Sequence, residues 1–394
     1  MPVSSSNSAS PANSTVQQGK GLWRPFVVVF ATLLAPVLAA VLFYQLDSFD
    51  PAPIPLHELS PVPPISALLV NDHILAGAEF LGKGQLKGPE DIAYDPKSQL
   101  IYTGCEDGWI KRVTVNESSA YSLVQNWVNT GGRPLGLVVG HNNELIVADS
   151  YKGLLNISKD GSVELLTNSA EDVKFKLTDA VDVAEDGTIY FTDASYKYNY
   201  HEVIWDFLEG RPYGRLHSYD PVTKETKVLV RNLYFANGVV ITPDQNYVVF
   251  CESPLRRCRK LKIQGEKKGE IERFVEDIPG YPDNILYDGE GHFWIALASG
   301  IVKGWEMAFR YPFIRKIMAL MEKYVGRPSM ERNGGVFAVD LEGKPVAHYY
   351  DSELSTISSG IKIQNHLYCG SLKYSFIIRL NLDRYAATHH SSRK

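Results

Sequence analysis

The chain has 394 residues, of which 44% are hydrophobic and 22% charged, and this composition fits one large folded core or two ordinary ones. Its 40 basic and 45 acidic residues leave a formal net charge of -5, so we expect no broad basic surface for nucleic acid. The 31 Gly, 22 Pro, 22 Tyr and 16 Phe favour many short strands joined by tight turns over a helical bundle.

The N-terminal region predicts a membrane anchor after a disordered cytosolic tail at 1–24. Residues 25–46 carry no formal charge, and a helix of that length would span roughly 33 Å, the thickness of a bilayer core. A cleaved signal peptide is the alternative, but its apolar core is shorter. Lys20 and Arg24 precede the span, which predicts a single-pass type II orientation. The rest of the chain is then lumenal or extracellular, in the endoplasmic reticulum, the vacuole or at the plasma membrane.

Several residues on the far side of the membrane fit an oxidising compartment. Sequons at Asn116 and Asn156 are candidate glycosylation sites. Cys251 and Cys258 flank a short stretch as though they face each other across a hairpin. Either a disulfide or a pair of buried thiols fits that position.

A motif recurs through residues 71–383, between a stiff proline-rich stalk expected at 47–70 and a disordered tail expected at 384–394. Each copy has a small or polar start, an apolar strand, a turn with Gly, Asp or Asn, and a second alternating strand. The copies begin at Glu90, Leu135, Asp179, Asn237, Asp283 and Ser359. Their spacing predicts an all-β fold, a six-bladed β-propeller, in which residues 76–82 close the ring with the last blade.

Two aromatic, helix-compatible segments interrupt the predicted third and fifth blades, at 196–214 and 303–332. The second segment contains seven basic and three acidic residues. Two interpretations are open: a lid over the central channel that touches the membrane surface, or a helical elaboration packed on the rim of the propeller.

Polar residues at the starts of innermost strands converge on the mouth of a propeller's channel, although they are far apart in the sequence. Glu90, Asn237 and Asp283 are such residues, and we expect Asn284 and Asp193 to join them. Carboxylate and amide oxygens suit calcium, which could polarise an ester or lactone carbonyl. Asp283 is then the candidate general base or nucleophile. Without a metal, the same residues would simply satisfy buried amides at strand starts.

The stretches "GPEDIAYD", "ANGVVITPD" and "PDNILYD" resemble segments of the strictosidine synthase-like family, especially its membrane-anchored branch. They are also similar to the calcium-ligand segments of the paraoxonases and related gluconolactonase propellers. The resemblance covers roughly residues 70–383 and extends to the N-terminal anchor. It implies a six-bladed propeller with calcium ligands at Glu90, Asp193, Asn237, Asp283 and Asn284.

Two departures from these families bear on the expected activity. Strictosidine synthase has its catalytic glutamate just ahead of the last inner strand, where this chain has about Ser359, so a condensing enzyme is disfavoured. Paraoxonases use a histidine pair, and the first partner's position matches Leu135. The leading hypothesis is a membrane-anchored, calcium-dependent hydrolase of small esters or lactones. A non-catalytic propeller that binds a partner is the second.

Overall fold

The computed structural model describes residues 27–61, 63–116 and 121–389, and it divides the chain into two compact units, Met1–Phe49 and Asp50–Lys394. The expected tail at 1–24 and the first two positions of the expected span therefore lie outside the described residues.

The first unit contains an apolar helix over Val27–Leu46, with a mean hydropathy of 2.5 and none of its window buried. It includes a π-helical turn, η1 (Phe30–Leu34), and the α-helix α2 (Ala35–Leu46). Pro36 lies at the start of α2, where its missing N–H and bulky ring disfavour an ordinary turn before it. The helix is long and apolar enough to cross a membrane.

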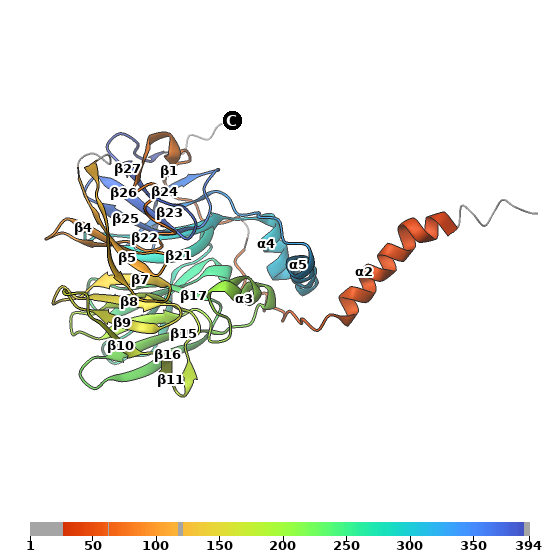
Figure 1. Cartoon of the computed structure of the whole chain (residues 1–394), viewed down its shortest axis with the longest axis horizontal. Helices are drawn as coiled ribbons and strands as arrows, with labels where there is room; N and C mark the ends of the chain where they lie inside the picture. The colour runs from red at the N-terminus through yellow and green to blue at the C-terminus, as the bar shows by residue number, and fades with distance from the viewer. Residues whose placement is uncertain (1–26, 62, 117–120, 390–394) are drawn as a thin grey trace, which may run out of the picture. The chain divides into compact units, whose positions relative to one another are not determined.

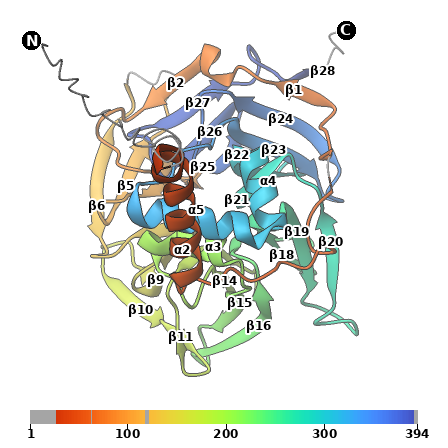
Figure 2. The same ribbon diagram turned by 90° about the vertical axis from the view of Figure 1, so that its right-hand side faces the viewer.

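The second unit is a six-bladed propeller, as predicted, with blades built from antiparallel strands (Figures 1 and 2). Strands are given from the inner to the outer one. Blade one contains β3 (Ala93–Asp95), β4 (Leu100–Gly104), β5 (Trp109–Thr114) and β6 (Val124–Asn129), and blade two contains β7 (Pro134–Val139), β8 (Leu145–Asp149), β9 (Gly153–Ile157) and β10 (Val163–Thr167). Blade three contains β13 (Thr178–Val183), β14 (Ile189–Asp193), β15 (Gly214–Asp220) and β16 (Glu225–Leu233). A small hairpin of β11 (Ser169–Ala170) and β12 (Val173–Lys174) precedes blade three.

The remaining blades complete the ring. Blade four contains β17 (Ala236–Ile241), β18 (Tyr247–Glu252), β19 (Arg257–Lys262) and β20 (Ile271–Val275), with the 3-10 turn η5 (Ser253–Leu255) between β18 and β19. Blade five contains β21 (Gly280–Tyr287), β22 (His292–Gly300), β23 (Gly334–Asp340) and β24 (Pro345–Asp351), extended outward by β1 (Leu69–Asn71) and β28 (Thr388–His389). Blade six contains β25 (Ile357–Ile363), β26 (His366–Ser371), β27 (Ile377–Asn381) and β2 (Ala78–Leu81).

The burial of each strand follows its place in the blade. Every residue of the inner strand β17 is buried, because neighbouring inner strands pack on both of its sides. The outer strand β10 has no buried residue, and β16 has exposed, half-buried and buried positions, as expected for strands that meet water. Continuous burial therefore marks the inner strand β17, and exposed positions mark the outer strands.

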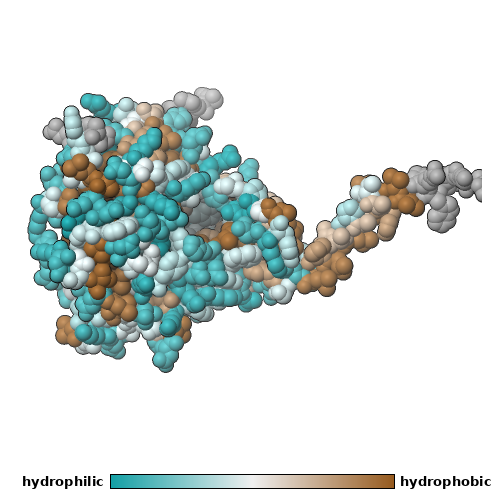
Figure 3. Space-filling model, in the orientation of Figure 1, coloured by the Kyte–Doolittle hydropathy of each residue, from teal (hydrophilic) through white to brown (hydrophobic). Residues whose placement is uncertain are grey.

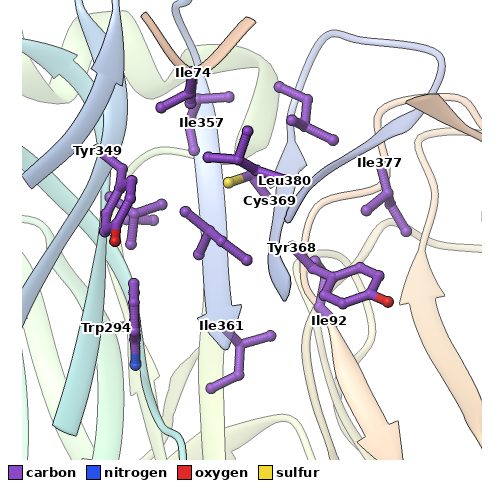
Figure 4. Packing of buried hydrophobic residues seen from close by; sticks show 14 of the residues in the cluster. Ile74, Ile92, Trp294, Tyr349, Ile357, Ile361, Tyr368, Cys369, Ile377 and Leu380 are labelled. Atoms are coloured by element: carbon purple, nitrogen blue, oxygen red, sulfur yellow. The ribbon is translucent and has the colours of Figure 1, made fainter. Parts of the chain in front are cut away.

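The ring closes between the N-terminal strand β2 and the last blade, as predicted for residues 76–82. Phe80 pairs with Ile378 in the antiparallel ladder of β2 and β27. The short turn η2 (Ile74–Gly77) adds Ile74 to a hydrophobic cluster that extends over blades five, six and one and includes Trp294 and Ile357 (Figure 4). Burial of this cluster stabilises the closure through the hydrophobic effect.

Glycines allow neighbouring inner strands to approach closely. A Cβ added at Gly238 of β17 would lie 2.5 Å from the Asp283 carbonyl oxygen and 2.6 Å from the Ile285 nitrogen of β21. One added at Gly136 of β7 would lie 2.6 Å from the Ala180 Cα of β13. The glycine after Asn237 is therefore required by backbone packing, and it leaves the strand start at Asn237 next to that at Asp283.

Residues 50–61 and 63–67 differ from the extended stalk that their prolines suggested, because they lie along the propeller. The Ile54 side chain is buried, and the Glu58 carboxylate lies 2.7 Å from the Arg257 guanidinium. Ser60 Oγ donates a 2.7 Å hydrogen bond to the Leu255 carbonyl. The apolar and acidic side chains of the segment gain contacts on the domain surface. We call residues 50–61 and 63–67 the strap.

Both predicted insertions form helices on the face of the ring where the inner strands begin (Figures 1 and 2). The first contains the 3-10 turn η4 (Tyr200–Glu202) and α3 (Val203–Glu209); the second contains α4 (Lys303–Arg310) and α5 (Pro312–Tyr324). The buried guanidinium of Arg315 on α5 joins them. It donates hydrogen bonds to the carbonyls of Ala308, Leu208, Glu209 and Ala52, and thus links α4, α3 and the strap.

We expect Gly238→Ala to lower the free energy of unfolding by about 1–3 kcal/mol, because the new methyl group must push β21 away from β17. Thermal unfolding of the full chain in detergent micelles measures this loss. Gly304→Ala is the matched control, since its Cβ would meet only the flexible Met330 side chain. Equal stability of the two variants would contradict the required close approach.

The buried carboxyl of Asp206 on α3 should make the stability of the fold depend on pH. Burial raises the pKa of its carboxyl to about 7. The charges of Glu209 and Asp193 also raise this pKa, whereas a hydrogen bond with Ser195 and the charge of Lys197 lower it. The folded state therefore holds a proton that the unfolded state releases above about pH 4. The contribution of this group to stability falls as the pH rises from about 4 to about 7, by roughly 1.4 kcal/mol per pH unit.

Asp206→Asn removes this titration, so the variant should equal the original chain at pH 4 and exceed it in melting temperature at pH 8. Asp160→Asn is the control, because backbone hydrogen bonding lowers the pKa of that exposed carboxyl and no gain at high pH is expected. The same stability difference at both pH values would rule out a proton on Asp206.

Candidate active site

Residues before or within the N-terminal halves of the inner strands line a cavity of about 480 Å³. Glu90 lies just before β3, Asp179 on β13, Asn237 on β17 and Asp283 on β21, and all four line this cavity. Each is at most 6% exposed. We call these four residues the oxygen cluster. Residues that are almost two hundred positions apart in the sequence thus share one pocket, because the ring places successive strand starts around one axis.

Hydrogen bonds position three members of the oxygen cluster. The Asn284 amide donates to Glu90 Oε1 at 2.8 Å, and the Asn237 amide forms a hydrogen bond with the Asp283 carboxylate. Asn284 is buried but does not line the cavity, so it orients Glu90 from behind. The structure therefore brings together four of the five predicted ligands: Glu90, Asn237, Asp283 and Asn284.

Two buried oxygen atoms of the cluster lack a donor. Within the described residues, Glu90 Oε2 and Asn237 Oδ1 have no hydrogen-bond partner. A buried acceptor without a partner costs about 1–3 kcal/mol, and a charged one costs more. A cation coordinated by both oxygens would remove that cost.

The charges around the cluster also favour a cation. Burial, followed by the neighbouring carboxylates of Asp91 and Asp283, raises the pKa of Glu90 well above its usual range. Burial and Asp179 do the same for Asp283, and the pKa of Asp179 itself rises to about 8. Arg133 opposes the shifts at Glu90 and Asp179, but one guanidinium cannot neutralise so many carboxylates.

The donor set is suited to a hard cation. Across the described part of the chain, no group of three or more His, Cys, Asp and Glu residues could hold a metal by itself. A cation at the oxygen cluster therefore depends on the Asn237 amide as well as on Glu90 and Asp283. Carboxylate and amide oxygens are ligands that calcium accepts, whereas zinc and copper sites use histidine or cysteine.

Asp193 does not belong to this cluster, which corrects the predicted ligand set. Its carboxylate forms a 2.7 Å ion pair with Arg215 and accepts a 3.1 Å hydrogen bond from the Leu177 backbone nitrogen. It does not line the cavity. Asp193 lies at the end of β14, a second strand, whereas Asp179 lies at the start of the inner strand β13. The register of the repeat, in which Asp179 begins a copy as Asn237 and Asp283 do, was the signal that could have identified Asp179.

The rest of the cavity is mainly apolar. Leu135, Leu177 and Phe235 contribute from the propeller, and the insertion helices contribute Tyr200, Val203, Ile204, Phe207, Trp305 and Phe309. The helices thus cover the cavity, which supports the lid interpretation over a simple rim elaboration. No histidine occurs among the described residues that line it, so its candidate proton acceptors are carboxylates.

Ser359 takes a structural role at the junction of the last and first blades. Its hydroxyl donates a 2.7 Å hydrogen bond to Asp91 Oδ1, and the neighbouring Ser358 hydroxyl donates to the Glu90 carbonyl at 2.7 Å. Ser359 is fully buried and does not line the cavity. The position that the sequence resemblance aligns with a catalytic glutamate therefore holds a small hydroxyl that joins two blades.

The predicted sites outside the cavity lie as follows. Cys251 and Cys258 face each other across β18 and β19 and form a disulfide in the structure. Asn116 is exposed, although the other two residues of its sequon, 117 and 118, lie outside the described residues. Asn156 is half-buried on β9, with its amide 3.5 Å from Glu164 Oε2. Glycosylation of both residues stays a prediction.

Known proteins share both the sequence and the fold. The family described as "Strictosidine synthase" matches residues 179–266, and the one described as "Strictosidine synthase-like, N-terminal" matches residues 70–113. Protein STRICTOSIDINE SYNTHASE-LIKE 6 of Arabidopsis thaliana is 55% identical over 91% of this chain and 96% of its own length. Adipocyte plasma membrane-associated protein of Gallus gallus is 32% identical over 91% of this chain and 89% of its own.

Solved structures with low sequence identity have a similar fold. A gluconolactonase from Xanthomonas campestris superposes with a TM-score of 0.56 at 14% identity, over 82% of this chain and 98% of that chain. A calcium-binding protein, regucalcin, from Agrobacterium tumefaciens superposes with a TM-score of 0.54 at 13% identity, over 80% and 95% respectively. At these identities the likeness concerns the fold alone. The sequence matches, which extend over nine-tenths of the chain, place this protein in the strictosidine synthase-like family.

Proposed function

We propose that this protein is a membrane-anchored, calcium-dependent hydrolase of small esters or lactones. The observation that carries the proposal is the pair of unpartnered buried oxygens, Glu90 Oε2 and Asn237 Oδ1, beside Asp283 in the lining of an apolar cavity. Such a cavity binds an uncharged organic molecule, and the oxygens supply the means to hold a cation next to it. The names of two structural neighbours, a gluconolactonase and a calcium-binding regucalcin, agree with this chemistry.

Glu90, Asn237 and Asp283 would hold the ion, with Asn284 keeping Glu90 in place through its 2.8 Å hydrogen bond. A calcium ion bound there would polarise the substrate carbonyl and stabilise negative charge that develops on its oxygen. The chain supplies the remaining functions. Asp283 accepts the proton of the attacking water, and Asp179 is a second carboxylate in the same cavity. The lid residues exclude bulk water from the reacting groups.

A non-catalytic propeller is the alternative function, in which the same cation only stabilises the ring. The buried carboxylates favour this alternative as much as they favour catalysis, because neutralising their charge stabilises the fold in either case. Condensation of an amine with an aldehyde is not supported, since Ser359 is buried and its hydroxyl donates a hydrogen bond to Asp91.

The proposed location is the endomembrane system, whether endoplasmic reticulum, vacuole or plasma membrane. The apolar helix over Val27–Leu46 would serve as a type II anchor, with the propeller on the lumenal or extracellular side. The Cys251–Cys258 disulfide is compatible with that oxidising side. The name of the relative from Gallus gallus, which is described as membrane-associated, agrees with an anchor.

Calcium should raise the melting temperature of the full chain in detergent micelles. At a concentration one hundred times the dissociation constant, ligand binding stabilises the folded state by about 2.7 kcal/mol. Asn237→Ala removes one of the unpartnered oxygens and should abolish most of this shift, while the exposed Asn142→Ala should keep it. An unchanged calcium response of Asn237→Ala would exclude this cation site.

Hydrolysis distinguishes the enzyme from the binding propeller. We expect the purified chain to cleave phenyl acetate or a small lactone with calcium, to lose this activity in EDTA and to regain it when calcium returns. Asp283→Asn should lower kcat/KM by about 100-fold or more, because the proton acceptor is lost. Asp186→Asn is the control, since that exposed carboxylate only caps the turn at Thr188. Calcium stabilisation without any turnover of these substrates would favour the binding propeller.

A further inference from the structure

The lid carries a second apolar surface that faces away from the cavity. Five side chains of α4, α5 and the residue between them are about half exposed: Met307 at 52%, Tyr311 at 50%, Phe313 at 52%, Ile317 at 45% and Tyr324 at 59%. We call these five residues the outer apolar face. Figure 3 shows hydrophobic residues on the side of the domain where Figure 1 labels α4 and α5.

These side chains form one surface. Phe313 and Ile317 are four positions apart on α5, so they lie on one side of that helix. Tyr311 joins the two helices, and its backbone nitrogen donates to the Met307 carbonyl in the last turn of α4. The rings of Tyr311 and Phe313 lie with their centroids 6.0 Å apart. The opposite side of α5 is occupied by the buried residues Arg315, Met318 and Ala319. The helix is therefore apolar on its outer side as well as toward the propeller, which is unusual for a helix that meets only water.

The strap restricts how far this surface can lie from the membrane. The Ala52 backbone nitrogen donates a 2.8 Å hydrogen bond to the Glu209 carbonyl, and its carbonyl accepts from the buried Arg315 guanidinium on α5. Only five residues separate Ala52 from Leu46, where the apolar helix ends. A fully extended chain covers at most about 3.6 Å per residue, so this connection can span no more than roughly 20 Å. A helix embedded in the bilayer would keep the lid beside the lipid headgroups.

The composition of the lid suits that position. Tyrosines at both ends of α5, Tyr311 and Tyr324, flank Phe313 and Ile317, and aromatic residues with a polar tip favour the boundary between lipid and water. The inserted segment 303–332 contains seven basic and three acidic residues, so its charge does not oppose a phospholipid surface.

We propose that the outer apolar face inserts into the lipid–water interface of the membrane that holds the anchor, so that α4 and α5 form a membrane-seated cover of the cavity. This inference rests on the anchoring part of the proposed function and is independent of calcium and of hydrolysis. Trp305 and Phe309 of α4 line the cavity on the other side of the same cover. The cover thus separates the lipid from the oxygen cluster by one layer of helices, and apolar molecules dissolved in the bilayer would reach the cavity at this layer.

Lipid quenching tests the contact with the full chain in phosphatidylcholine nanodiscs. Phe313→Cys and Ile317→Cys are each labelled with bimane, and the nanodiscs contain lipid with a shallow doxyl quencher. The control is Val222→Cys, which is 89% exposed on the turn between β15 and β16 of blade three. Native thiols interfere little, because Cys105 and Cys369 are buried and the other two cysteines form a disulfide.

We expect doxyl lipid to quench bimane at 313 and 317 several-fold more than at 222. Phe313→Asp with Ile317→Asp should abolish quenching of a label at Met307→Cys, whereas Val222→Asp should leave it unchanged. Equal, weak quenching at all sites in chains that stay on the nanodisc would overturn the inference and leave the anchor intact.

Two further outcomes would also reject it. Chains that separate from nanodiscs during size-exclusion chromatography would refute the anchor, and the inference with it. Bimane emission that depends on protein concentration and not on doxyl lipid would assign the outer apolar face to a second copy of the chain.

Discussion

Ring closure by the pairing of β2 with β27 is the constraint on which the rest of the structure depends. It fixes the number of blades and directs the inner strands toward one axis. Only that geometry brings Glu90 and Asp283 into one cavity, because almost two hundred residues separate them in the sequence. Gly136 and Gly238 complete the arrangement, since their missing side chains allow neighbouring inner strands to approach within backbone contact.

The buried polar groups of the cavity destabilise the folded state. Burial raises the pKa values of Glu90, Asp179 and Asp283, and two acceptor oxygens have no donor within the described residues. A structure selected only for stability would replace these groups by apolar side chains, because unpaired buried charge destabilises the folded state. Their concentration at one end of an otherwise apolar cavity is the pattern expected where polar groups serve a ligand.

The lid connects the cavity to the N-terminal part of the second unit. Arg315 has its guanidinium bound by backbone carbonyls of α3, α4 and the strap, and it is fully buried. Charge-assisted hydrogen bonds of this kind are stronger than neutral ones, and the C-terminal end of α3 adds a favourable dipole at Glu209. The same side chain thus positions the cover of the cavity and holds the chain a few residues after the apolar helix.

The sequence by itself determined the all-β class, the six repeats, the closure of the ring, the two insertions and the apolar N-terminal helix. These features depend on local periodicity and on turn residues, which can be recognised in the sequence. It also identified Glu90, Asn237, Asp283 and Asn284, because each lies at a strand start of the repeat.

Only the tertiary structure decided which polar groups share the cavity and which face other partners. The sequence predicts Asp193 as a ligand and not Asp179, but the Asp193 carboxylate forms an ion pair with Arg215, whereas Asp179 lines the cavity. The proline-rich segment lies along the domain because Ile54 and Glu58 find an apolar surface and an arginine that come from distant strands. Such partnerships between residues far apart in the chain leave no local pattern, so they are settled only when the ring closes.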